Sequence, residues 1–147
     1  MATPFLLLVA APGLNYGKVF PTNLDTPSSR LVHASRMGDF TAVRRCFLDH
    51  EIEHLDLDSA LDAAAAHAHA DIVEFLVRFG ATDLESALLS AAARDHAKVV
   101  AYLISSDRRH PATNTRAAQT LASNIGAYNC DWLLTAHRWE QHRRRRQ

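Results

Sequence analysis

Nine histidines are the side chains of this 147-residue sequence best suited to bind a metal. Their spacing does not favour a site. His67 and His69 are two residues apart, which on a helix points them about 200° from each other. His50 and His54 have the i, i+4 spacing that places two ligands on one helical face, but they fall where an expected helix ends. We therefore expect no metal and no cofactor.

Carboxylates and thiols are the other groups that could do chemistry. Asp56, Asp58 and Asp62 are spaced like part of a calcium loop, yet the glycine and terminal glutamate of such a loop are missing. Cys46 and Cys130 have no histidine base beside them, so we expect small core residues of a reducing compartment. No glycine-rich phosphate loop, nucleophile elbow or metal motif occurs. The sequence predicts no enzyme and no small-molecule substrate.

Arginine dominates the C-terminal end, where Arg143, Arg144, Arg145 and Arg146 are consecutive. Such a cluster can bind nucleic acid phosphates, an anionic membrane, an acidic partner or a nuclear import receptor. No aromatic residues interleave with it, so sequence-specific base recognition is not expected. We define residues 141–147 as a basic tail that leaves open a weak contact with nucleic acid or an acidic partner.

An internal repeat determines the elements that position these side chains. SALDAAAAHAHADIVEFLV at 59–77 reappears 27 residues later as SALLSAAARDHAKVVAYLI at 86–104. A weaker copy lies at 31–48 and the weakest at 117–134. This period is typical of a stacked array, in which no single unit buries its apolar face alone.

Each unit is expected to contain two short helices joined by a tight turn. The first helix is alanine-rich and narrow, as at 59–67, which lets neighbouring units approach closely. The second, as at 70–78, has apolar residues at the spacing of a buried helical stripe. Small inner helices and bulky outer helices together predict a curved stack, in which Thr26 or Ser28 can cap the first helix.

The sequence therefore predicts an all-α repeat solenoid of about four helix-turn-helix units after an extended N-terminal arm at 1–28. The units are expected at 29–56, 57–84, 85–113 and 114–140, which together form one repeat domain at 29–140. The apolar run in FLLLVAAPGL at 5–14 is too short to span a bilayer and has no basic residue before it, so secretion is not expected. We expect the arm to lay Phe5 to Leu8 on the first unit.

These features resemble the ankyrin repeat. That family has two alanines, a Gly-His turn, an Ile-Val pair, a Leu-Leu pair and Gly-Ala-Asp. The second unit of this chain has Ala64-Ala65, Ala68-His69, Ile72-Val73, Phe75-Leu76 and Gly80-Ala81, followed by Thr82-Asp83. The resemblance implies that His69 and His96 occupy the turn and hydrogen-bond backbone there.

The sequence departs from the ankyrin pattern in three ways. The opening Thr-Pro-Leu-His motif is reduced to Ser-Ala-Leu-Asp at 59–62 and Ser-Ala-Leu-Leu at 86–89. Units recur every 27 to 30 residues, not the usual 33 or so, so projecting β-hairpin fingers are not expected. The fourth unit is eroded, with Asp131 and Trp132 where the family has smaller or apolar residues, and we interpret it as a cap.

The resemblance implies that another protein binds the concave surface formed by the first helices and the loops between units. The matching positions are Arg36, Met37, Asp56, Asp58, Asp62, His67, Asp83, Glu85, Arg94 and Asp95. Because the apolar positions are committed to packing, we expect these side chains to be free to choose a partner.

Charge is unevenly distributed, although the formal net charge is zero. Residues 49–85 contain ten acidic side chains and one basic one, Arg78, whereas residues 86–147 contain ten basic and four acidic ones. We expect a dipole along the stack. It can orient a partner or let molecules pair head to tail, and the alternative is that both patches only maintain solubility.

The function that we predict is a non-catalytic adaptor or scaffold in the cytoplasm, with the nucleus also open. One alternative is a structural subunit whose apolar arm and basic tail are buried in a larger assembly. A second alternative is an accessory factor that contacts nucleic acid through the basic tail. The identity of the partner is not encoded, because one fold binds unrelated targets through its surface residues.

Overall fold

The computed structural model describes residues 26–49, 56–106 and 115–146 of the chain. Within these ranges the chain forms helices and no strand. In chain order the helices are α1 (Pro27–Met37), α2 (Phe40–Asp49), α3 (Leu57–Ala66), α4 (Ala70–Arg78), α5 (Leu84–Ala92), α6 (Ala97–Ser106), α7 (Thr115–Ile125) and α8 (Tyr128–Arg144). The expected contacts of residues 5–8 lie outside the described residues.

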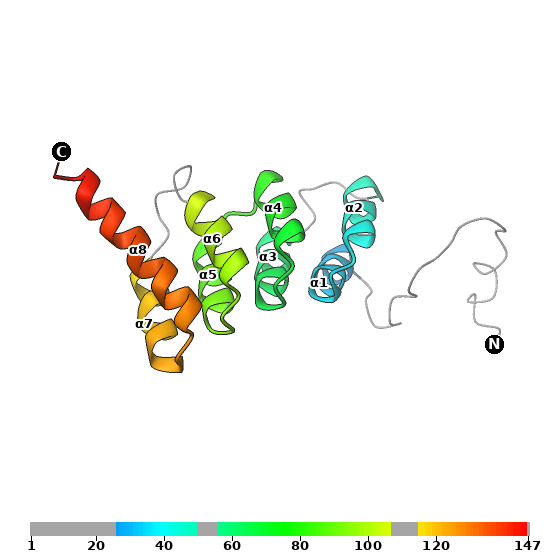
Figure 1. Cartoon of the computed structure of the whole chain (residues 1–147). Coiled ribbons are helices and arrows are strands. Elements are labelled where there is room, and N and C mark those ends of the chain that lie inside the picture. Colours follow the sequence, from blue (N-terminus) through cyan, green and yellow to red (C-terminus); the bar gives the residue numbers. More distant parts are fainter. Residues whose placement is uncertain (1–25, 50–55, 107–114, 147) are drawn as a thin grey trace, which may run out of the picture.

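The helices stack as four pairs in chain order, α1 with α2 at one end and α7 with α8 at the other (Figure 1). The first helices of the pairs, α1, α3, α5 and α7, form one layer, which we call the inner helices. The second helices, α2, α4, α6 and α8, form the outer layer. The predicted all-α solenoid of four helix-turn-helix units is confirmed.

Each inner helix buries the same positions along its length. The fifth residue is Leu31, Leu61 or Leu88 in the first three units, and each is fully buried. The eighth residue is an alanine in all four units: Ala34, Ala64, Ala91 and Ala122. A buried leucine contributes about 1.5–3 kcal/mol, and alanine lets the helix backbones approach closely. The repeated sequence pattern is therefore the packing pattern.

The fourth unit is polar at positions that the other units keep apolar. Gln119 occupies the place of the buried leucines, and its amide donates to the Thr135 hydroxyl at 2.8 Å. Asp131 occupies the place of the buried residues Val73 and Val100, and it accepts a 2.7 Å hydrogen bond from Ser123. Terminal repeats require a polar outer face because no further unit covers them. The structure thus agrees with the interpretation of this unit as a cap.

The four turns between inner and outer helices share one backbone conformation. Their left-handed residues are Gly38, Ala68, Asp95 and Gly126, with φ of 74°, 63°, 57° and 81°. In each turn the next residue donates its N–H to the carbonyl five residues earlier, as His69 does to Ala64 at 3.0 Å. This bond satisfies a carbonyl at the end of the inner helix and fixes the direction of the outer helix.

Histidines link neighbouring units at these turns. His69 Nε2 lies 3.1 Å from the Arg36 carbonyl oxygen, and His96 Nε2 lies 3.0 Å from that of Ala66. A carbonyl oxygen only accepts, so Nε2 carries the hydrogen in both rings. The expected hydrogen bond to backbone is present, but the acceptor belongs to the preceding unit. Gly38 is needed at the first junction, because a Cβ there would lie 2.4 Å from the His69 ring.

A cluster of four phenylalanines joins the outer helices of the first two units. Phe40 and Phe47 of α2 meet Phe75 of α4 and Phe79, which directly follows α4, with ring centroids 4.9 to 5.4 Å apart between the units and 4.4 Å apart between Phe75 and Phe79. Edge and tilted contacts of this kind stabilise aromatic pairs by about 0.5–1.5 kcal/mol beyond area burial. The cluster therefore supports the outer layer where α2 and α4 face each other.

Both ends of the repeat domain differ from the expected boundaries. Thr26 caps α1 by accepting the Ser29 N–H at 3.1 Å, so Pro27 and Ser28 belong to the helix. At the other end α8 continues through Arg144, and the expected boundary at 140 falls inside it. Glu140 and Arg144 form an i, i+4 ion pair that favours this extension. Among the described helices, none has the length and apolar character to cross a membrane.

The left-handed turn predicts opposite effects for two glycine substitutions. Ala68→Gly relieves a conformation that disfavours alanine, so we expect the free energy of unfolding to rise by about 0.5–1 kcal/mol. Ala63→Gly, in the interior of α3, should lower it by about 0.5–1 kcal/mol. Urea unfolding followed by circular dichroism measures both. A destabilised Ala68→Gly variant would contradict the turn geometry.

Candidate partner-binding surface

The side chains expected to meet a partner lie mainly along the inner helices. We call this surface the inner-helix face. It is formed by exposed or half-buried residues of the four inner helices: Arg36, Asp58, Ser59, Asp62, Glu85, Ser86, Ser90, Arg116, Thr120 and Asn124. The predicted residues Met37, His67, Arg94 and Asp95 lie beside it in the turns, and Asp56 and Asp83 lie beside it before α3 and α5.

Charge is separated across the inner-helix face. Asp56, Asp58 and Asp83 lie at the amino ends of α3 and α5, whereas His67 and Arg94 follow their carboxyl ends. Carboxylates stabilise the positive end of a helix dipole and cations stabilise the negative end. The second and third units therefore present an acidic edge and a basic edge. This separation of charge runs across the stack. It is distinct from the charge dipole that the sequence predicts along the stack.

Asp58 is committed to the neighbouring unit. Its carboxylate accepts the backbone N–H of Thr82 at 2.7 Å and of Asp83 at 3.0 Å, as well as the Thr82 hydroxyl. Burial raises the pKa of Asp58, but these hydrogen bonds outweigh it and leave the pKa below its usual value. The carboxylate thus holds the loop that leads into α5.

Three more predicted aspartates make intramolecular hydrogen bonds. Asp56 and Asp83 cap α3 and α5 by accepting backbone N–H groups at 2.9 and 3.0 Å. Asp62 accepts the Ser90 hydroxyl at 2.5 Å and the Ser86 hydroxyl at 3.2 Å. Both serines belong to α5, so Asp62 joins the second unit to the third.

The third turn supplies two further links between units. Arg94 donates to the Ala66 carbonyl at 2.9 Å, beside the bond made by His96. Asp95 accepts the Cys130 N–H at 3.0 Å and the Asn129 side chain at 2.7 Å. Cys130 is the third residue of α8, so Asp95 caps that helix from the preceding unit.

The expectation that all predicted side chains are free for a partner is therefore wrong for six of them: Asp56, Asp58, Asp62, Asp83, Arg94 and Asp95. Their hydrogen bonds connect units or cap helices. A charge reversal at Asp62 or Arg94 would disturb the stack itself. Within the described part of the chain, the side chains of Arg36 and Glu85 have neither a hydrogen bond nor an ion pair.

The residues before the left-handed turns form a row that we call the turn row: Met37, His67, Arg94 and Ile125. All four are exposed, Met37 to 51% and Ile125 to 55%. Burial, followed by the nearby Arg94, His69, Arg36 and His96, lowers the pKa of His67. The turn row thus has apolar residues, Met37 and Ile125, at its two ends, and His67 between them lies near basic side chains.

The cysteines lie in the packed interior. Both are buried and form no disulfide. Burial, and then contact with Asp95, raises the pKa of Cys130 to about 12. Burial is also the main cause that raises the pKa of Cys46. The neutral thiol is favoured at both positions, as expected for small core residues. Among the described residues no three histidine, cysteine or acidic side chains group closely enough to hold a metal.

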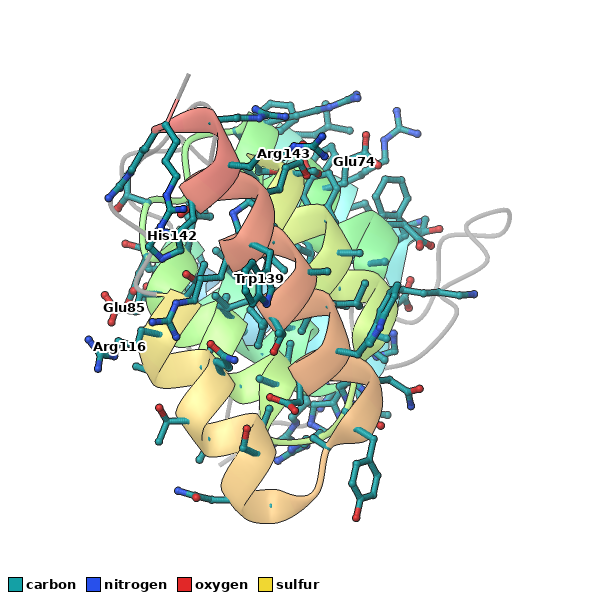
Figure 2. All side chains as sticks on the ribbon, turned by 60° about the vertical axis from the view of Figure 1, so that its left-hand side comes forward. Glu74, Glu85, Arg116, Trp139, His142 and Arg143 are labelled. Atoms are coloured by element: carbon teal, nitrogen blue, oxygen red, sulfur yellow. The ribbon has the colours of Figure 1, made fainter. Side chains whose placement is uncertain are left out.

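The C-terminal helix contains features that the sequence analysis missed. Trp132 and Trp139 are 70% and 73% exposed on α8. Figure 2 shows Trp139 on the outward surface of α8, with His142 and Arg143 further along the helix. Arg143 and Arg144 belong to α8, and Arg145 and Arg146 follow it directly. In the sequence analysis the arginines belong to a separate tail from residue 141. That boundary did not reveal that they continue the helix that contains the residues before 141.

Comparison with known protein families gives one match, over residues 56–87. The matched stretch contains α3, α4 and the beginning of α5, which is the unit with the acidic edge and the turn histidine. The matching family model is that of the ankyrin repeat, and residues 56–87 are similar to it. No curated protein sequence matches the chain.

Ankyrin repeats are generally protein–protein interaction modules and are typically non-catalytic. The turn histidine and left-handed residue of the matched repeat recur in the third unit as His96 and Asp95. The first and fourth units keep the helix pair and the left-handed turn. The ankyrin repeat therefore lies within a stack of similar units.

The cap of α8 by Asp95 predicts a measurable loss. Asp95→Ala should lower the free energy of unfolding by about 1–2 kcal/mol, because the Cys130 N–H loses its acceptor. Asp95→Asn keeps an acceptor and the left-handed turn, so it should lose less. Urea unfolding at neutral pH measures both variants.

The pH dependence of this cap has a defined sign. The hydrogen bond from the Cys130 N–H is the main cause that lowers the pKa of Asp95 in the folded protein. The stability that the carboxylate adds is thus present above its unfolded pKa and lost as pH falls through the folded pKa. The difference between wild type and Asp95→Ala should shrink on acidification. A constant difference from pH 6 to pH 3 would contradict this assignment.

Proposed function

We propose that this protein is a non-catalytic adaptor that binds another protein through the inner-helix face and the turn row. The observation that carries the proposal is the set of exposed groups that the stack does not use. Among the described residues, the side chains of Arg36 and Glu85 have neither a hydrogen bond nor an ion pair, and Met37 and Ile125 expose apolar surface at the two ends of the turn row. Most other apolar side chains of the repeats are packed in the core, although Leu48, Tyr128 and Trp132 are also exposed on the outer helices.

The chemistry of the surface defines the partner. Arg36, beside the turn row, favours a carboxylate on the partner. The acidic edge, with Glu85 as its unpaired member, favours cations on the opposite side. Complementary charges of this kind increase association rate and fix the orientation of a complex. Met37 and Ile125 would supply apolar contacts at either end.

The proposal includes the cytoplasm as the place of action. Its support is that Cys46 and Cys130 are buried, unpaired thiols. Disulfides are rare in the cytosol, where thiols are kept reduced. Fractionation of cells that express the tagged full chain tests this part, and recovery in the secreted fraction would contradict it.

A double charge reversal tests the surface without changing net charge. Arg36→Glu combined with Glu85→Arg reverses one charge beside the turn row and one charge at the acidic edge. Neither side chain supports the fold, so the free energy of unfolding should stay within about 0.5 kcal/mol of wild type. Affinity for the partner should fall at least about tenfold, because like charges then face each other.

The matched control is Arg45→Glu combined with Asp49→Arg, which inverts two exposed charges on the outer helix α2. Proteins captured by wild type and by both variants are compared by quantitative mass spectrometry, and calorimetry then measures the affinity of a purified candidate. The proposal requires a protein that is lost only with the inner-helix reversal. If every captured protein binds both variants equally, binding does not use this face.

A further inference from the structure

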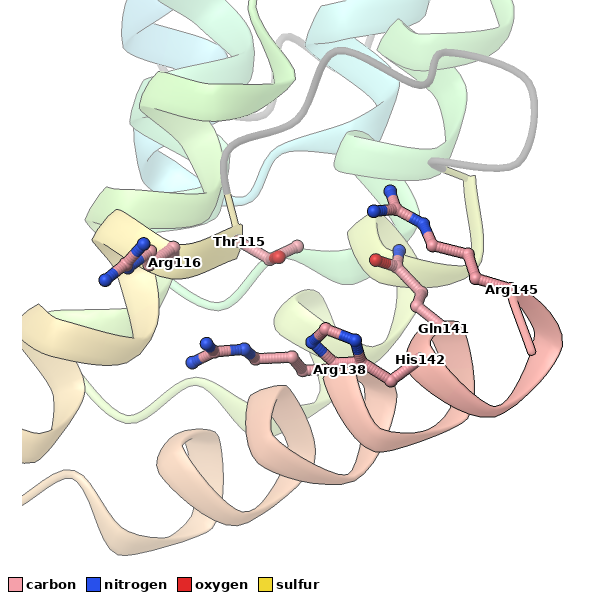
Figure 3. A pocket seen from close by; sticks show the side chains of 6 residues that line it. All are labelled: Thr115, Arg116, Arg138, Gln141, His142 and Arg145. Carbon is pink, nitrogen blue, oxygen red and sulfur yellow. The ribbon is translucent and has the colours of Figure 1, made fainter.

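A cavity of about 120 Å³ lies between the first turn of α7 and the C-terminal half of α8. It is lined by Thr115, Arg116, Arg138, Gln141, His142 and Arg145. Figure 3 shows Thr115 between Arg116 of α7 and the basic side chains of Arg138 and His142 on α8 and of Arg145 directly after it. The α8 residues recur at helical spacing, because 138, 142 and 145 are four and three residues apart.

None of the described residues that line this cavity carries a carboxylate. Glu140, the acidic residue of this part of α8, is paired with Arg144, which does not line it. Arg138 makes a long hydrogen bond of 3.4 Å to the neutral Gln119 side chain. Three arginines and a histidine thus line one cavity, with no acidic residue among its described lining. Neighbouring positive charges repel one another, so an anion bound in the cavity would stabilise this part of the protein.

The size and shape of the cavity narrow the class of anion. A volume near 120 Å³ is large enough for a tetrahedral oxyanion group. Figure 3 shows Arg116 and Arg138 on one side of Thr115 and Arg145 on the other. Guanidinium groups donate pairs of parallel hydrogen bonds that match phosphate oxygens. A phosphomonoester adds a charge of about −1.5 to −2 at pH 7, more than a carboxylate or a phosphodiester.

We propose that this cavity binds the phosphate group of a phosphomonoester, with Arg116, Arg138 and Arg145 as its main donors. Thr115 contributes a hydroxyl, whereas the Gln141 amide nitrogen lies 2.7 Å from His137 Nε2. Neither the ankyrin repeat match nor the inner-helix face predicts this site, since it uses α8 residues beyond the repeat pattern. The phosphate can belong to a phosphorylated side chain or to a free phosphate compound, and both present the same dianion.

The first test is a titration of the full chain with O-phosphoserine, phenyl phosphate and inorganic phosphate, followed by nuclear magnetic resonance of the Thr115 and Arg116 backbone amides. We expect saturable shifts at these two residues. Dimethyl phosphate, a monoanionic diester, should bind at least about tenfold more weakly. Preference for O-phosphoserine indicates a phosphorylated side chain as the source, and preference for inorganic phosphate indicates a free compound.

The second test uses variants matched in charge. Arg116→Gln combined with Arg145→Gln removes two charges from the cavity, and affinity for O-phosphoserine should fall at least about tenfold. Arg143→Gln combined with Arg146→Gln removes two charges from the same end of the molecule but leaves the lining intact. This control should change affinity less than threefold. Circular dichroism verifies that both variants remain helical.

Three results would overturn the proposal. The first is the absence of saturable shifts with any phosphomonoester. The second is an equal loss of affinity in both double variants, which indicates diffuse attraction to the basic end. The third is tighter binding of a twelve-nucleotide single strand that weakens equally in both variants, which indicates a nucleic acid surface. Each result is independent of the Arg36 and Glu85 reversal, so this site and the adaptor function fail separately.

Discussion

The left-handed turn between the two helices of each unit is the constraint on which the stack depends. It ends the inner helix so that a carbonyl at its last turn faces the next unit, where His69 and His96 donate to Arg36 and Ala66. Ala127 takes the histidine position in the fourth unit and has no side-chain donor. There the earlier unit supplies the side chain, and Asp95 of the third unit accepts the Cys130 N–H of α8. Every junction in the described stack therefore has a polar link beside its alanine and leucine packing.

These links decide which surface is left for a partner. Asp58 and Asp62 look like exposed acids in a repeat, but their carboxylates hold the loop before α5 and the serines of α5. Polar groups that join units cannot be exchanged without a cost in stability. The side chains of Arg36 and Glu85 make no such hydrogen bond between units among the described residues. The basic cavity at the α7–α8 end likewise has no acidic side chain among its described lining residues. We therefore assign the binding of a partner or an anion to side chains that do not hold the units together.

The sequence predicted the helices well because stacking demands the same residue type at the same position in each unit. Leu61 and Leu88, or Val73 and Val100, repeat for that reason, and the turn histidines are visible by the same logic. The partners of Asp58, Asp62 and Asp95 were not predictable, because each hydrogen bond joins residues 24 to 35 positions apart. Their distances depend on how closely two units approach. The basic cavity was missed for a different reason: the helical spacing of 138, 142 and 145 is present in the sequence but crosses the assumed start of the tail.

The most direct test of this account is the hydrogen-bonded state of the turn histidines. Long-range proton–nitrogen correlation spectra of the full chain distinguish the two neutral imidazole tautomers. The structure predicts that His69 and His96 both carry their hydrogen on Nε2 at neutral pH, because each Nε2 faces a carbonyl oxygen of the preceding unit. It also predicts that this state is lost when urea unfolds the stack. Rings that carry the hydrogen on Nδ1, or that average between both tautomers in the folded protein, would contradict the linkage that the account places at the centre of the fold.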